Sequence, residues 1–593
     1  MQVRDKQHRP TLSTAALPVA CSWFALSGII ALLAFILYMT FVPSLPTEPG
    51  FTLNHWKSIL SSRLLTQVIP NTAIVGFGTI FVAAFFALPL SWLLNRTDLP
   101  FRNSFITMMG IMPVIPGFIL AMGWIMLLDE RIGLLNLAVA HLLGLESLPF
   151  NIKNNPFGIA WVMGVVLTPG IFFLIAGPLR ALDPALEEAA SVAGFSQWST
   201  VFRISLPLVW PGIFGGLIYT FMTAVSIFEI PALLGAASGK VPVLASEIFY
   251  AVRPGGPTAA TFAYGAAGVY GVLIAVPSLG ALYLYLRTLA RSERYQVIKG
   301  KAYRPREMNL GALKWLGVAF VVFYLMLAVV LPLSVLLWAS LMPVLQLPSL
   351  EAFSKLSLRN YYGLLAPLGG FPVIRNTVTV VVSVSLLVSF FSFMISWVVV
   401  RTQLRSRKLV DMLAMLPHAI PGLAFAFALA MLGVLASVWL PWLPLSGTLG
   451  IIMVAHLINR LPFATRIMNS ALAQVHWELE ESAQVCGSKN LTIMRKIVLP
   501  LVKPSFIYLA IWTAILSFQE VTMALFLSGP HNQLFSVAIW ELWDGGSLGV
   551  ASAGAVTMVG VIGTLMFMVL RSTGGTVSGA QTVWPRLPSS DTR

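Results

Sequence analysis

Asp183–Gly194 reads DPALEEAASVAG, and His476–Gly487, which begins 293 positions later, reads HWELEESAQVCG. Each copy has a Glu pair, small residues after it, and a Gly six residues beyond the second Glu. Each copy then runs on to a matching exit, Ile204-Ser205-Leu206-Pro207 in the first and Ile497-Val498-Leu499-Pro500 in the second. One such string is typical of any polar helix that ends at Gly, but two copies with the same exit indicate a feature that was duplicated.

The composition around these copies is that of an integral membrane protein. Of the 593 residues 57% are hydrophobic and only 10% are charged, and the mean hydropathy is +0.84. A soluble protein of this size needs about a quarter of its residues charged. About twelve stretches are long enough for a hydrocarbon core of about 30 Å. These predicted spans centre on residues 17–42, 68–94, 104–128, 157–179, 207–229, 262–286, 315–340, 376–400, 410–433, 447–468, 503–526 and 547–570.

The charge distribution predicts the orientation of these spans. The net charge is +15, which in a soluble protein would suggest nucleic acid, but cytoplasmic loops of membrane proteins retain Lys and Arg. If the N-terminus lies inside, only 9 of the 37 Lys and Arg residues fall in outer segments. We therefore expect a multi-pass membrane protein, with lipid around it, both termini cytoplasmic and no nucleic-acid partner. The two cysteines, Cys21 and Cys486, predict no disulfide.

The duplication extends beyond the two loops. Asn71-Thr72, Ser91-Trp92 and Arg96-Thr97 match Asn376-Thr377, Ser396-Trp397 and Arg401-Thr402 at an offset of 305. Since the offset shrinks to 293 at the loops, the first half must carry an outer insertion, which we place around residues 145–155. An even number of spans per half makes the repeats parallel, related by a pseudo-two-fold axis along the membrane normal.

We therefore expect three segments along the chain. Residues 1–300 form a first repeat with its loop at 183–207, residues 301–571 form a second repeat with its loop at 476–500, and residues 572–593 form a disordered cytoplasmic tail. The basic stretch 287–314 is the expected link between the repeats on the cytoplasmic side. The fold class is all-α and polytopic, with two parallel pseudo-symmetric halves.

The loop residues predict a compact knob of two short helices. Asp183 can cap the first helix, Pro184 suits its first turn, and Gly194 suits its end with a positive φ angle. Small residues would let a partner approach closely, and a Glu would offer its carboxylate to a partner's Arg or Lys. The expected docking residues are Glu188, Ala189, Ala190, Gly194, Ile204 and Pro207 in the first copy and Glu481, Ser482, Ala483, Gly487, Ile497 and Pro500 in the second.

This pattern resembles the EAA loop of permease subunits in binding-protein-dependent ABC importers, and the chain resembles two such permeases fused into one. The resemblance implies a type I importer fold in a bacterial inner (plasma) membrane, two copies of a separate ABC ATPase docked at the two loops, and an extracytoplasmic solute-binding protein. The fused arrangement most resembles the ferric iron permeases, with thiamine, polyamine and aminoethylphosphonate permeases as alternatives. A twelve-helix secondary transporter is the leading alternative from another class, and a scaffold protein is the third.

The chain carries no recognisable catalytic chemistry of its own. A phosphate-binding loop needs Gly-x-x-x-x-Gly-Lys before Ser or Thr, and no such string is present in the sequence. The sequence also shows no catalytic triad and no metal-ligand cluster. We therefore expect no catalytic residue, no metal site and no cofactor in this chain, with ATP and Mg²⁺ held by the partner subunits.

Two acidic residues are the candidates for the solute path. Glu229 and Glu520 occupy similar places late in the fifth span of each half, and carboxylates inside a bilayer are costly enough to suggest a function. The equally plausible alternative is that both are ordinary helix-end charges paired with a neighbouring donor. His418 and His456 are better explained as packing residues, and the proline pairs Pro113/Pro116 and Pro417/Pro421 as kinks.

Overall fold

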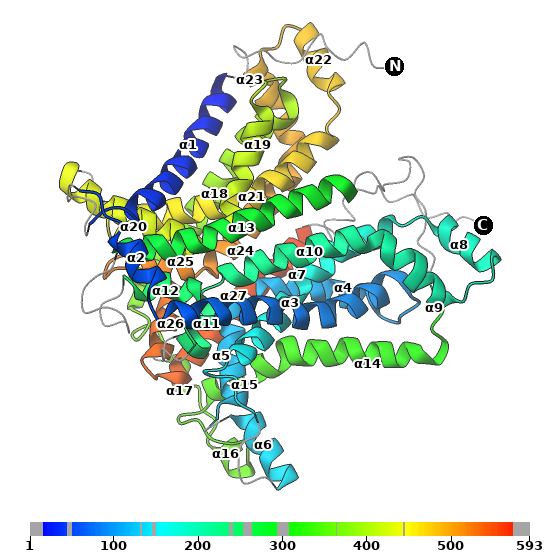
Figure 1. Ribbon diagram of the computed structural model, residues 1–593, viewed down its shortest axis with the longest axis vertical. Coiled ribbons are helices and arrows are strands. Elements are labelled where there is room, and N and C mark those ends of the chain that lie inside the picture. Colours follow the sequence, from blue (N-terminus) through cyan, green and yellow to red (C-terminus); the bar gives the residue numbers. More distant parts are fainter. Residues whose placement is uncertain are drawn as a thin grey trace. The chain divides into compact units, whose positions relative to one another are not determined.

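The computed structural model describes residues 16–43, 50–130, 133–144, 150–236, 241–252, 264–292, 308–362, 364–442 and 445–572. Throughout these residues the regular secondary structure is helical (Figure 1). Within the described ranges, eleven helices are long and apolar enough to cross a membrane, or twelve if one bent pair is counted as a single span. The all-α polytopic fold with about twelve spans is confirmed. The predicted tail, 572–593, lies outside the described residues except for its first residue.

The helices of the first repeat come in the order α1 (Ala16–Met39), α2 (Asn54–Leu60), α3 (Leu65–Arg96), α4 (Arg102–Ile111), α5 (Gly117–Leu128), α6 (Leu134–Leu143), α7 (Pro156–Ala181), α8 (Pro184–Val192), α9 (Gln197–Thr200), α10 (Leu206–Ser226), α11 (Glu229–Pro231), α12 (Leu244–Tyr250) and α13 (Tyr264–Ser292).

The helices of the second repeat are α14 (Lys314–Leu325), α15 (Leu331–Leu341), α16 (Leu350–Ser354), α17 (Arg359–Tyr362), α18 (Gly370–Arg401), α19 (Arg407–Met415), α20 (Gly422–Trp439), α21 (Leu449–Gln474), α22 (Glu478–Val485), α23 (Asn490–Ile493), α24 (Leu499–Phe518), α25 (Thr522–Leu527), α26 (Phe535–Asp544) and α27 (Leu548–Ser572).

The proline pairs break the third span of each repeat. In the first repeat, Arg102–Val114 and Gly117–Leu128 meet at an angle of 96°. In the second repeat α19 ends at Met415 and α20 begins only at Gly422, so the predicted span 410–433 is wrong in its start and is divided at Pro417 and Pro421. Proline removes a backbone donor and clashes with the preceding turn, which explains why both breaks fall at these residues.

The helices pack into two compact units, each with its own apolar core. Unit 1 comprises residues 1–66, 244–278 and 359–554, and unit 2 comprises residues 67–243, 279–358 and 555–593. The core of unit 1 gathers buried side chains of α1, α18, α20, α21 and α24, and the core of unit 2 gathers those of α3, α7, α10 and α14.

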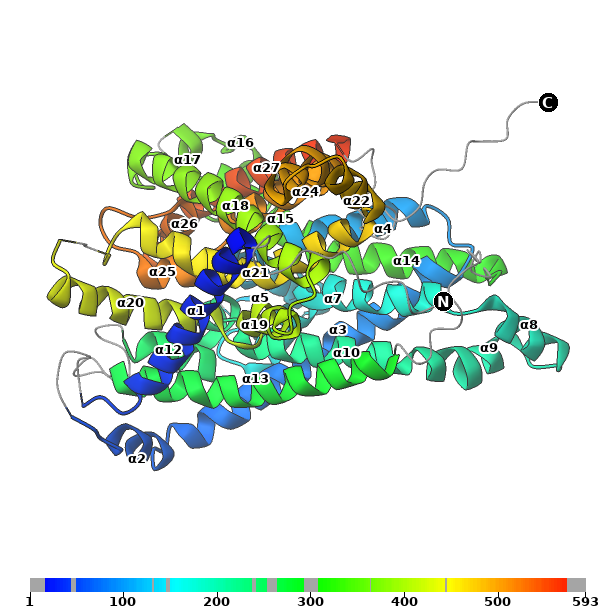
Figure 2. The same ribbon diagram turned by 90° about the horizontal axis from the view of Figure 1, so that it is seen from above.

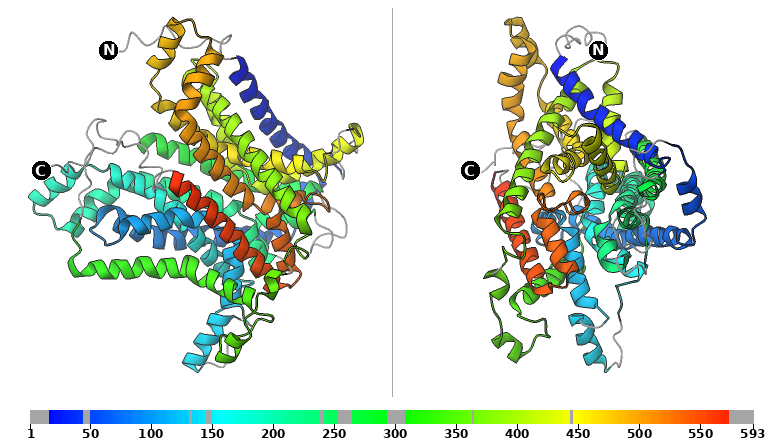
Figure 3. Two further views of the ribbon diagram at one scale, coloured as in Figure 1. Left: turned by 180° about the vertical axis from the view of Figure 1, so that it is seen from behind. Right: turned by 90° about the vertical axis from the view of Figure 1, so that its left-hand side faces the viewer.

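These units differ from the two contiguous repeats, because each contains the first span of the other repeat. In unit 1, α1 packs against α18 and α20, and Figure 3 shows α1 in blue beside the yellow-green α18. In unit 2, α15 packs against α5, and Tyr324 of α14 donates its hydroxyl to the Val165 carbonyl of α7 at 3.0 Å. The repeat boundary at residue 300 stays a prediction about the duplication and does not describe a packing boundary.

Repeated residues make the same contacts in both repeats. The Asn71 amide donates to the carbonyl of Pro242 at 3.1 Å, and the Asn376 amide donates to that of Gln533 at 3.3 Å. Ser91 and Ser396 donate to the carbonyls of Phe172 and Thr465 at 3.3 and 3.2 Å. The residues shared at an offset of 305 therefore hold the first long helix of each repeat core against the same neighbours.

The structure adds detail to two further expectations. The first repeat has a short helix, α6, between α5 and α7, and none is described between α20 and α21, where residues 443–444 lie outside the described part. The insertion expected around residues 145–155 stays a prediction, because 145–149 are also outside the described part. In the link between the repeats, Met308 is paired with the chain after α3, since its N–H donates to the Arg96 carbonyl at 2.8 Å.

Candidate functional site

The first repeated loop begins as its sequence predicts. The Asp183 carboxylate accepts a hydrogen bond from the Ala185 N–H at 2.9 Å and caps α8, and Pro184 occupies the first turn. Asp at this position satisfies one of the backbone donors that a helix leaves free at its start. The second copy lacks this cap, since Trp477 stands at the start of α22 and its side chain makes no capping hydrogen bond.

Both first helices end in the same hydrogen-bonded motif. Gly194 and Gly487 have φ angles of +83° and +80°, so the predicted left-handed conformation is confirmed. The N–H of Phe195 donates to the Ala190 carbonyl at 3.0 Å, and that of Gly194 to the Ser191 carbonyl at 3.1 Å. The bonds Ser488 to Ala483 and Gly487 to Gln484, both 2.9 Å, repeat this pattern in the second copy. This is a Schellman motif, in which Gly serves because it has no Cβ.

A second short helix follows in each copy and leads into a long one. In the first copy α9 continues through a π-helical turn, Val201–Ser205, into α10, and in the second α23 continues through Met494–Val498 into α24. Ile204 and Ile497 lie in these turns, and Pro207 and Pro500 lie in the first turn of α10 and α24. Figures 1 and 2 show α8 and α9 beyond the N-terminal end of α10, so the knob lies at the tip of unit 2.

The structure separates the expected docking residues by exposure. Glu188, Ala189 and Ser482 are exposed, and Glu481 and Ala483 are half-buried. Ala190, in contrast, is only 4% exposed and packs within its own unit, so it offers no surface to a partner. The first copy thus presents the exposed carboxylate of Glu188 and the second the half-buried carboxylate of Glu481, each with small residues beside it.

Apolar side chains extend this exposed surface. Val192 and Val485, which close the two helices, are 90% and 87% exposed. Further exposed apolar residues are Leu186, Phe195, Trp198 and Phe202 in the first copy and Trp477, Leu479 and Leu491 in the second. Exposed apolar clusters of this kind mark contact surfaces for other proteins or for membrane. We call these two sets, together with Glu188 and Glu481, the knob surfaces.

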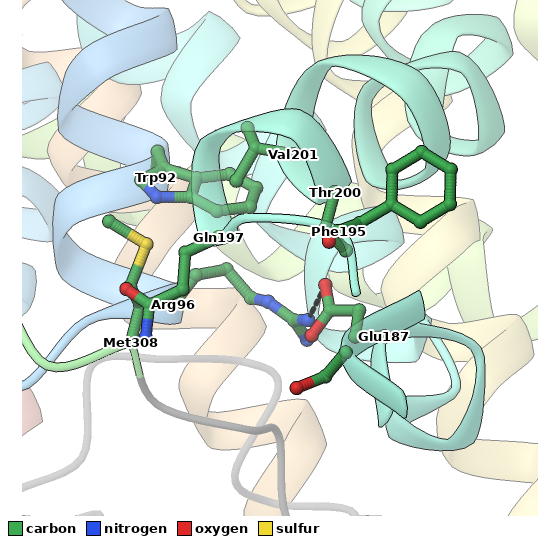
Figure 4. Close-up of a pocket in the computed structure, with 9 residues that line it drawn as sticks. Trp92, Arg96, Glu187, Phe195, Gln197, Thr200, Val201 and Met308 are labelled. Atoms are coloured by element: carbon green, nitrogen blue, oxygen red, sulfur yellow. Dashed lines mark ion pairs between the residues drawn. The ribbon is translucent and has the colours of Figure 1, made fainter. Parts of the chain in front are cut away.

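The other Glu of each pair is buried and paired inside its own unit. Glu187 forms an ion pair with Arg96, which comes from the end of α3, and accepts a hydrogen bond from the Ser205 hydroxyl at 2.7 Å (Figure 4). The exposed fraction is 8% for Glu187 and 1% for Arg96. Arg96 also donates to the Leu179 carbonyl at 3.4 Å. One buried contact thus joins α8 to α3, to the end of α7 and to the turn before α10.

The second copy repeats this ion pair. Arg401, at the end of α18, lies 3.0 Å from the Glu480 carboxylate of α22 and donates to the carbonyls of Leu472 and Val475 at 2.9 and 2.8 Å. Leu472 is the repeat equivalent of Leu179. Burial raises the pKa of the Glu480 carboxyl above its ordinary value, and the charge of Arg401 opposes this rise.

These paired residues were missed by the sequence reasoning, which assigned function to the second Glu of each pair. A signal was available, because Arg96 and Arg401 match across the repeats, as do Glu187 and Glu480. What the pattern could not give is the partner, since Arg96 and Glu187 are 91 positions apart in the chain.

A small pocket lies beside the first ion pair in unit 2. It is lined by Trp92, Arg96, Glu187, Ser191, Phe195, Gln197, Thr200, Val201 and Met308. In Figure 4 Trp92 and Met308 lie on the side of Arg96, and Phe195 and Thr200 lie on the side of α8 and α9. The linker residue Met308 therefore forms part of the wall between the knob and the end of α3.

The candidate path residues have different surroundings. Glu520 is 8% exposed, and its carboxylate accepts hydrogen bonds from the N–H groups of Met523 and Ala524 at 2.7 and 3.1 Å and lies 3.0 Å from His456 Nε2. Glu520 therefore caps the first turn of α25, which agrees with the alternative that it is an ordinary helix-end charge. Glu229 begins α11 and is half-buried. The two belong to different units, so their role as an acidic pair stays a prediction.

Comparison with known proteins finds similarity to membrane components of transport systems. Residues 363–572 match the family described as "Binding-protein-dependent transport system inner membrane component". The chain is 23% identical over 552 residues to the ferric transport system permease protein FbpB of Actinobacillus pleuropneumoniae, covering 91% of this chain and 77% of that protein. It is also 23% identical over 518 residues to the putative ferric transport system permease protein FbpB 1 of Haemophilus influenzae, covering 86% and 78%.

A relative with a different solute matches a shorter part of the chain. The putative 2-aminoethylphosphonate transport system permease protein PhnV of Salmonella paratyphi A is 28% identical over 165 residues. This match covers 28% of this chain and 60% of that protein. The two ferric relatives thus match most of the chain, whereas this one matches a stretch shorter than a single repeat.

Proposed function

We propose a solute and a set of partners for this chain from its membership among the fused permease components of binding-protein-dependent ABC importers. The solute is ferric iron, delivered from the extracytoplasmic side by a solute-binding protein. The observation that carries this proposal is that the two ferric relatives match 91% and 86% of the chain, including both knobs. Both termini lie in the cytoplasm in this proposal, because the knobs must face the ATPase.

Two ABC ATPase subunits power the transport and bind one knob each. The chain itself has no phosphate-binding loop, so ATP and Mg²⁺ are held by those subunits. The knob surfaces support this assignment, since each combines an exposed or half-exposed carboxylate with a nearly fully exposed valine at the end of a rigid short helix. A partner groove with an Arg or Lys and an apolar floor would fix both position and orientation.

Glu229 and Glu520 remain the proposed acidic residues of the iron path. A cation that passes close to a carboxylate lowers the cost of holding that charge within a bilayer. Glu520 contributes mainly its charge, since both of its oxygens already accept hydrogen bonds from the first turn of α25.

Cys486 gives a direct test of docking. This cysteine is free and exposed at the end of α22, next to Val485. In a Cys21→Ser background, a membrane-impermeant maleimide should label Cys486 in inside-out vesicles, and co-expression of the cognate ATPase should slow that labelling. An Ala193→Cys variant places a thiol at the equivalent position of the first knob and should behave in the same way.

The control for that test is Leu142→Cys in a background that lacks both native cysteines. Leu142 is 81% exposed on α6, which the charge pattern places on the outer side. This thiol should react from the opposite side of the membrane and ignore the ATPase. Equal labelling of Cys486 with and without the ATPase would remove the knob from the interface, and labelling from the outer side would reverse the orientation.

Charge reversal tests the carboxylates of the knob surfaces. Glu188→Arg with Glu481→Arg should abolish co-purification of the ATPase, or uncouple its hydrolysis from transport, while the purified chain keeps its thermal midpoint. Glu351→Arg is the matched control, because Glu351 is exposed on α16 in a surface pair with Lys355. Normal assembly and normal transport in the Glu188/Glu481 variant would contradict the assignment.

Uptake by reconstituted vesicles tests the solute. With the cognate binding protein present, ferric iron should be taken up in an ATP-dependent manner, and 2-aminoethylphosphonate, thiamine and polyamines should not. Specific uptake of one of these instead would replace iron as the solute and leave the docking assignment intact. Uptake without ATPase subunits, driven by an ion gradient, would indicate a secondary transporter.

A further inference from the structure

Each buried ion pair joins a knob helix to the first long helix of its repeat core, α8 to α3 and α22 to α18. Among the described residues, these are the only ion pairs that connect those helices. We propose that Arg96 with Glu187, and Arg401 with Glu480, are the positioning residues that transmit movement of the knobs to α3 and α18. This inference rests on the proposed function, in which ATPase subunits bind and move the knobs.

The packing of the knob explains why such a connection is needed. In unit 2, α8 packs against α9 and the following π-helical turn, and in unit 1 α22 packs against α23 and its turn. These neighbours are the chain segments that directly follow each knob helix. A force applied to α8 therefore reaches α10 along the chain. It reaches α3 through Arg96, which lies on the last residue of that helix and contacts the Glu187 carboxylate directly.

Arginine is suited to this role because its planar group can bind several acceptors in fixed directions. Arg96 binds the Glu187 carboxylate and the Leu179 carbonyl, and Arg401 binds the Glu480 carboxylate and the Leu472 carbonyl. Leu179 and Leu472 lie near the ends of α7 and α21, just before the knobs. Each guanidinium therefore fixes three segments relative to one another: the long core helix, the helix that precedes the knob, and the knob itself.

Stability alone gives a weak reason for these pairs. Removing two charges from water is costly, and well-packed apolar residues of similar volume often stabilise a buried position as well or better. The same costly arrangement nevertheless occurs in both repeats, although the sequences around it have diverged. A directional contact that keeps knob and core helix in register is the property that an apolar pair would not supply.

The two copies differ in one respect that predicts an asymmetry. Glu187 accepts a second hydrogen bond from Ser205 in the turn before α10, whereas the equivalent position in the second copy is Val498. Arg401 has instead a second carbonyl acceptor, Val475. The first knob is thus tied more firmly to the helix that follows it, and the second to the helix that precedes it.

The test measures the amount of solute moved per ATP hydrolysed in vesicles that contain the full chain, both ATPase subunits and the binding protein, with ferric iron as the probe. Glu187→Gln with Glu480→Gln removes both charges and keeps the side-chain shape. We expect the ATPase to co-purify as in the wild type and the ratio of transport to hydrolysis to fall by about 5- to 150-fold, the range typical of coupling between two sites.

Two further variants separate coupling from folding. The exchange Arg96→Glu with Glu187→Arg should restore most of the ratio that Arg96→Glu alone loses. Arg466→Met is the matched control, because Arg466 is half-exposed and pairs with Asp411 at 3.4 Å on the surface of unit 1. It should leave the ratio unchanged.

Three outcomes overturn the inference. An unchanged ratio in the double Gln variant would show that the pairs transmit nothing. Loss of folded protein in every variant, or a fall in transport that only follows the fall in yield, would show a structural role alone. If the ATPase did not bind even to the wild-type chain, the proposed function would fail first, and the co-purification measured in the same experiment distinguishes that case.

Discussion

Substitution of Gly194 and Gly487 by Val tests the knob geometry most sharply, because the structure isolates a single cause. Both residues have φ near +80°, and a Cβ built at either position meets no atom within 4 Å. The whole penalty is therefore the left-handed backbone, which costs a residue with a side chain roughly 1–2 kcal/mol and a β-branched residue the upper part of that range. At about 2 kcal/mol per copy, the ratio of intact to altered helix ends falls by about 30-fold, which is the upper bound on the loss of ATPase affinity.

The assay is the affinity of the ATPase for the purified chain in detergent, measured for a graded series at position 194. Asn tolerates the left-handed conformation better than other residues with a side chain, so Gly194→Asn should lie close to the wild type, and Gly194→Val should bind up to about 30-fold more weakly. Gly280→Val in α13 is the matched control, since a Cβ there also meets nothing within 4 Å and the backbone is helical.

Two results would refute this reasoning. If Gly194→Val bound the ATPase as tightly as the Gly280→Val control, the end of α8 would not have to keep its Schellman motif for docking. If Asn were as harmful as Val, the cause would be the added side chain and not the φ angle. Equal losses of binding and of folded protein would assign Gly194 to folding, with Gly487→Val as an independent measurement of the same question.

Three other substitutions test the packing and the charges of the two units. Gly123→Val should lower the thermal midpoint of the purified chain by an amount equivalent to about 1–3 kcal/mol, because a Cβ there would lie 2.5 Å from the Pro332 carbonyl oxygen, and Gly280→Val should not. Glu520→Gln should also lower the midpoint, since it weakens a charged cap of α25, and an unchanged midpoint would show that the cap contributes nothing. Burial raises the pKa of Glu247, on α12 outside the candidate spans, to about 7. Between about pH 4.5 and 7 the folded state thus retains this proton while the unfolded chain has lost it. The free energy of unfolding should therefore fall by at most about 1.4 kcal/mol per pH unit across this range. Glu247→Gln should remove that pH dependence, as measured by thermal unfolding scans at several pH values.

The features that the sequence predicted correctly are those set by local chemistry. The number of spans follows from the length of apolar runs, and the end of each knob helix follows from a Gly that can adopt a positive φ angle. Asp183 and Pro184 begin α8 as expected, because capping involves only residues two or three positions apart. The same reasoning works less well in the second copy, where α22 begins at Glu478 without a side-chain cap.

The features that the sequence did not predict depend on contacts distant in the chain. Pro113 and Pro116 predicted a kink. The angle of 96° between the two parts of this span depends on what α5 packs against, including α15 from the other repeat. The exchange of first spans leaves no trace in the hydrophobic pattern, since α1 would be equally apolar beside its own repeat. Which Glu of each pair is buried depends on the rotation of α8 and α22 about their axes, and that rotation is fixed by Arg96 and Arg401.

The neighbouring carboxylates of each knob have separate roles because of helical geometry. Consecutive residues of a helix point about 100° apart, so Glu187 can face the core of its unit while Glu188 faces outward. The inner carboxylate is already neutralised by Arg96, which leaves the outer one as the charge that a partner can recognise. Reversal of Glu188 should therefore weaken docking without loosening α8 from α3, and removal of Glu187 should loosen α8 without changing the charge on the knob surface. Measured together, the two variants should be additive in their effects on ATPase affinity and on coupling, because one residue acts on binding and the other on what binding moves. A strong departure from additivity would mean that the Glu188 carboxylate also interacts with Arg96. Arg96 would then act both in docking of the ATPase and in transmitting its movement.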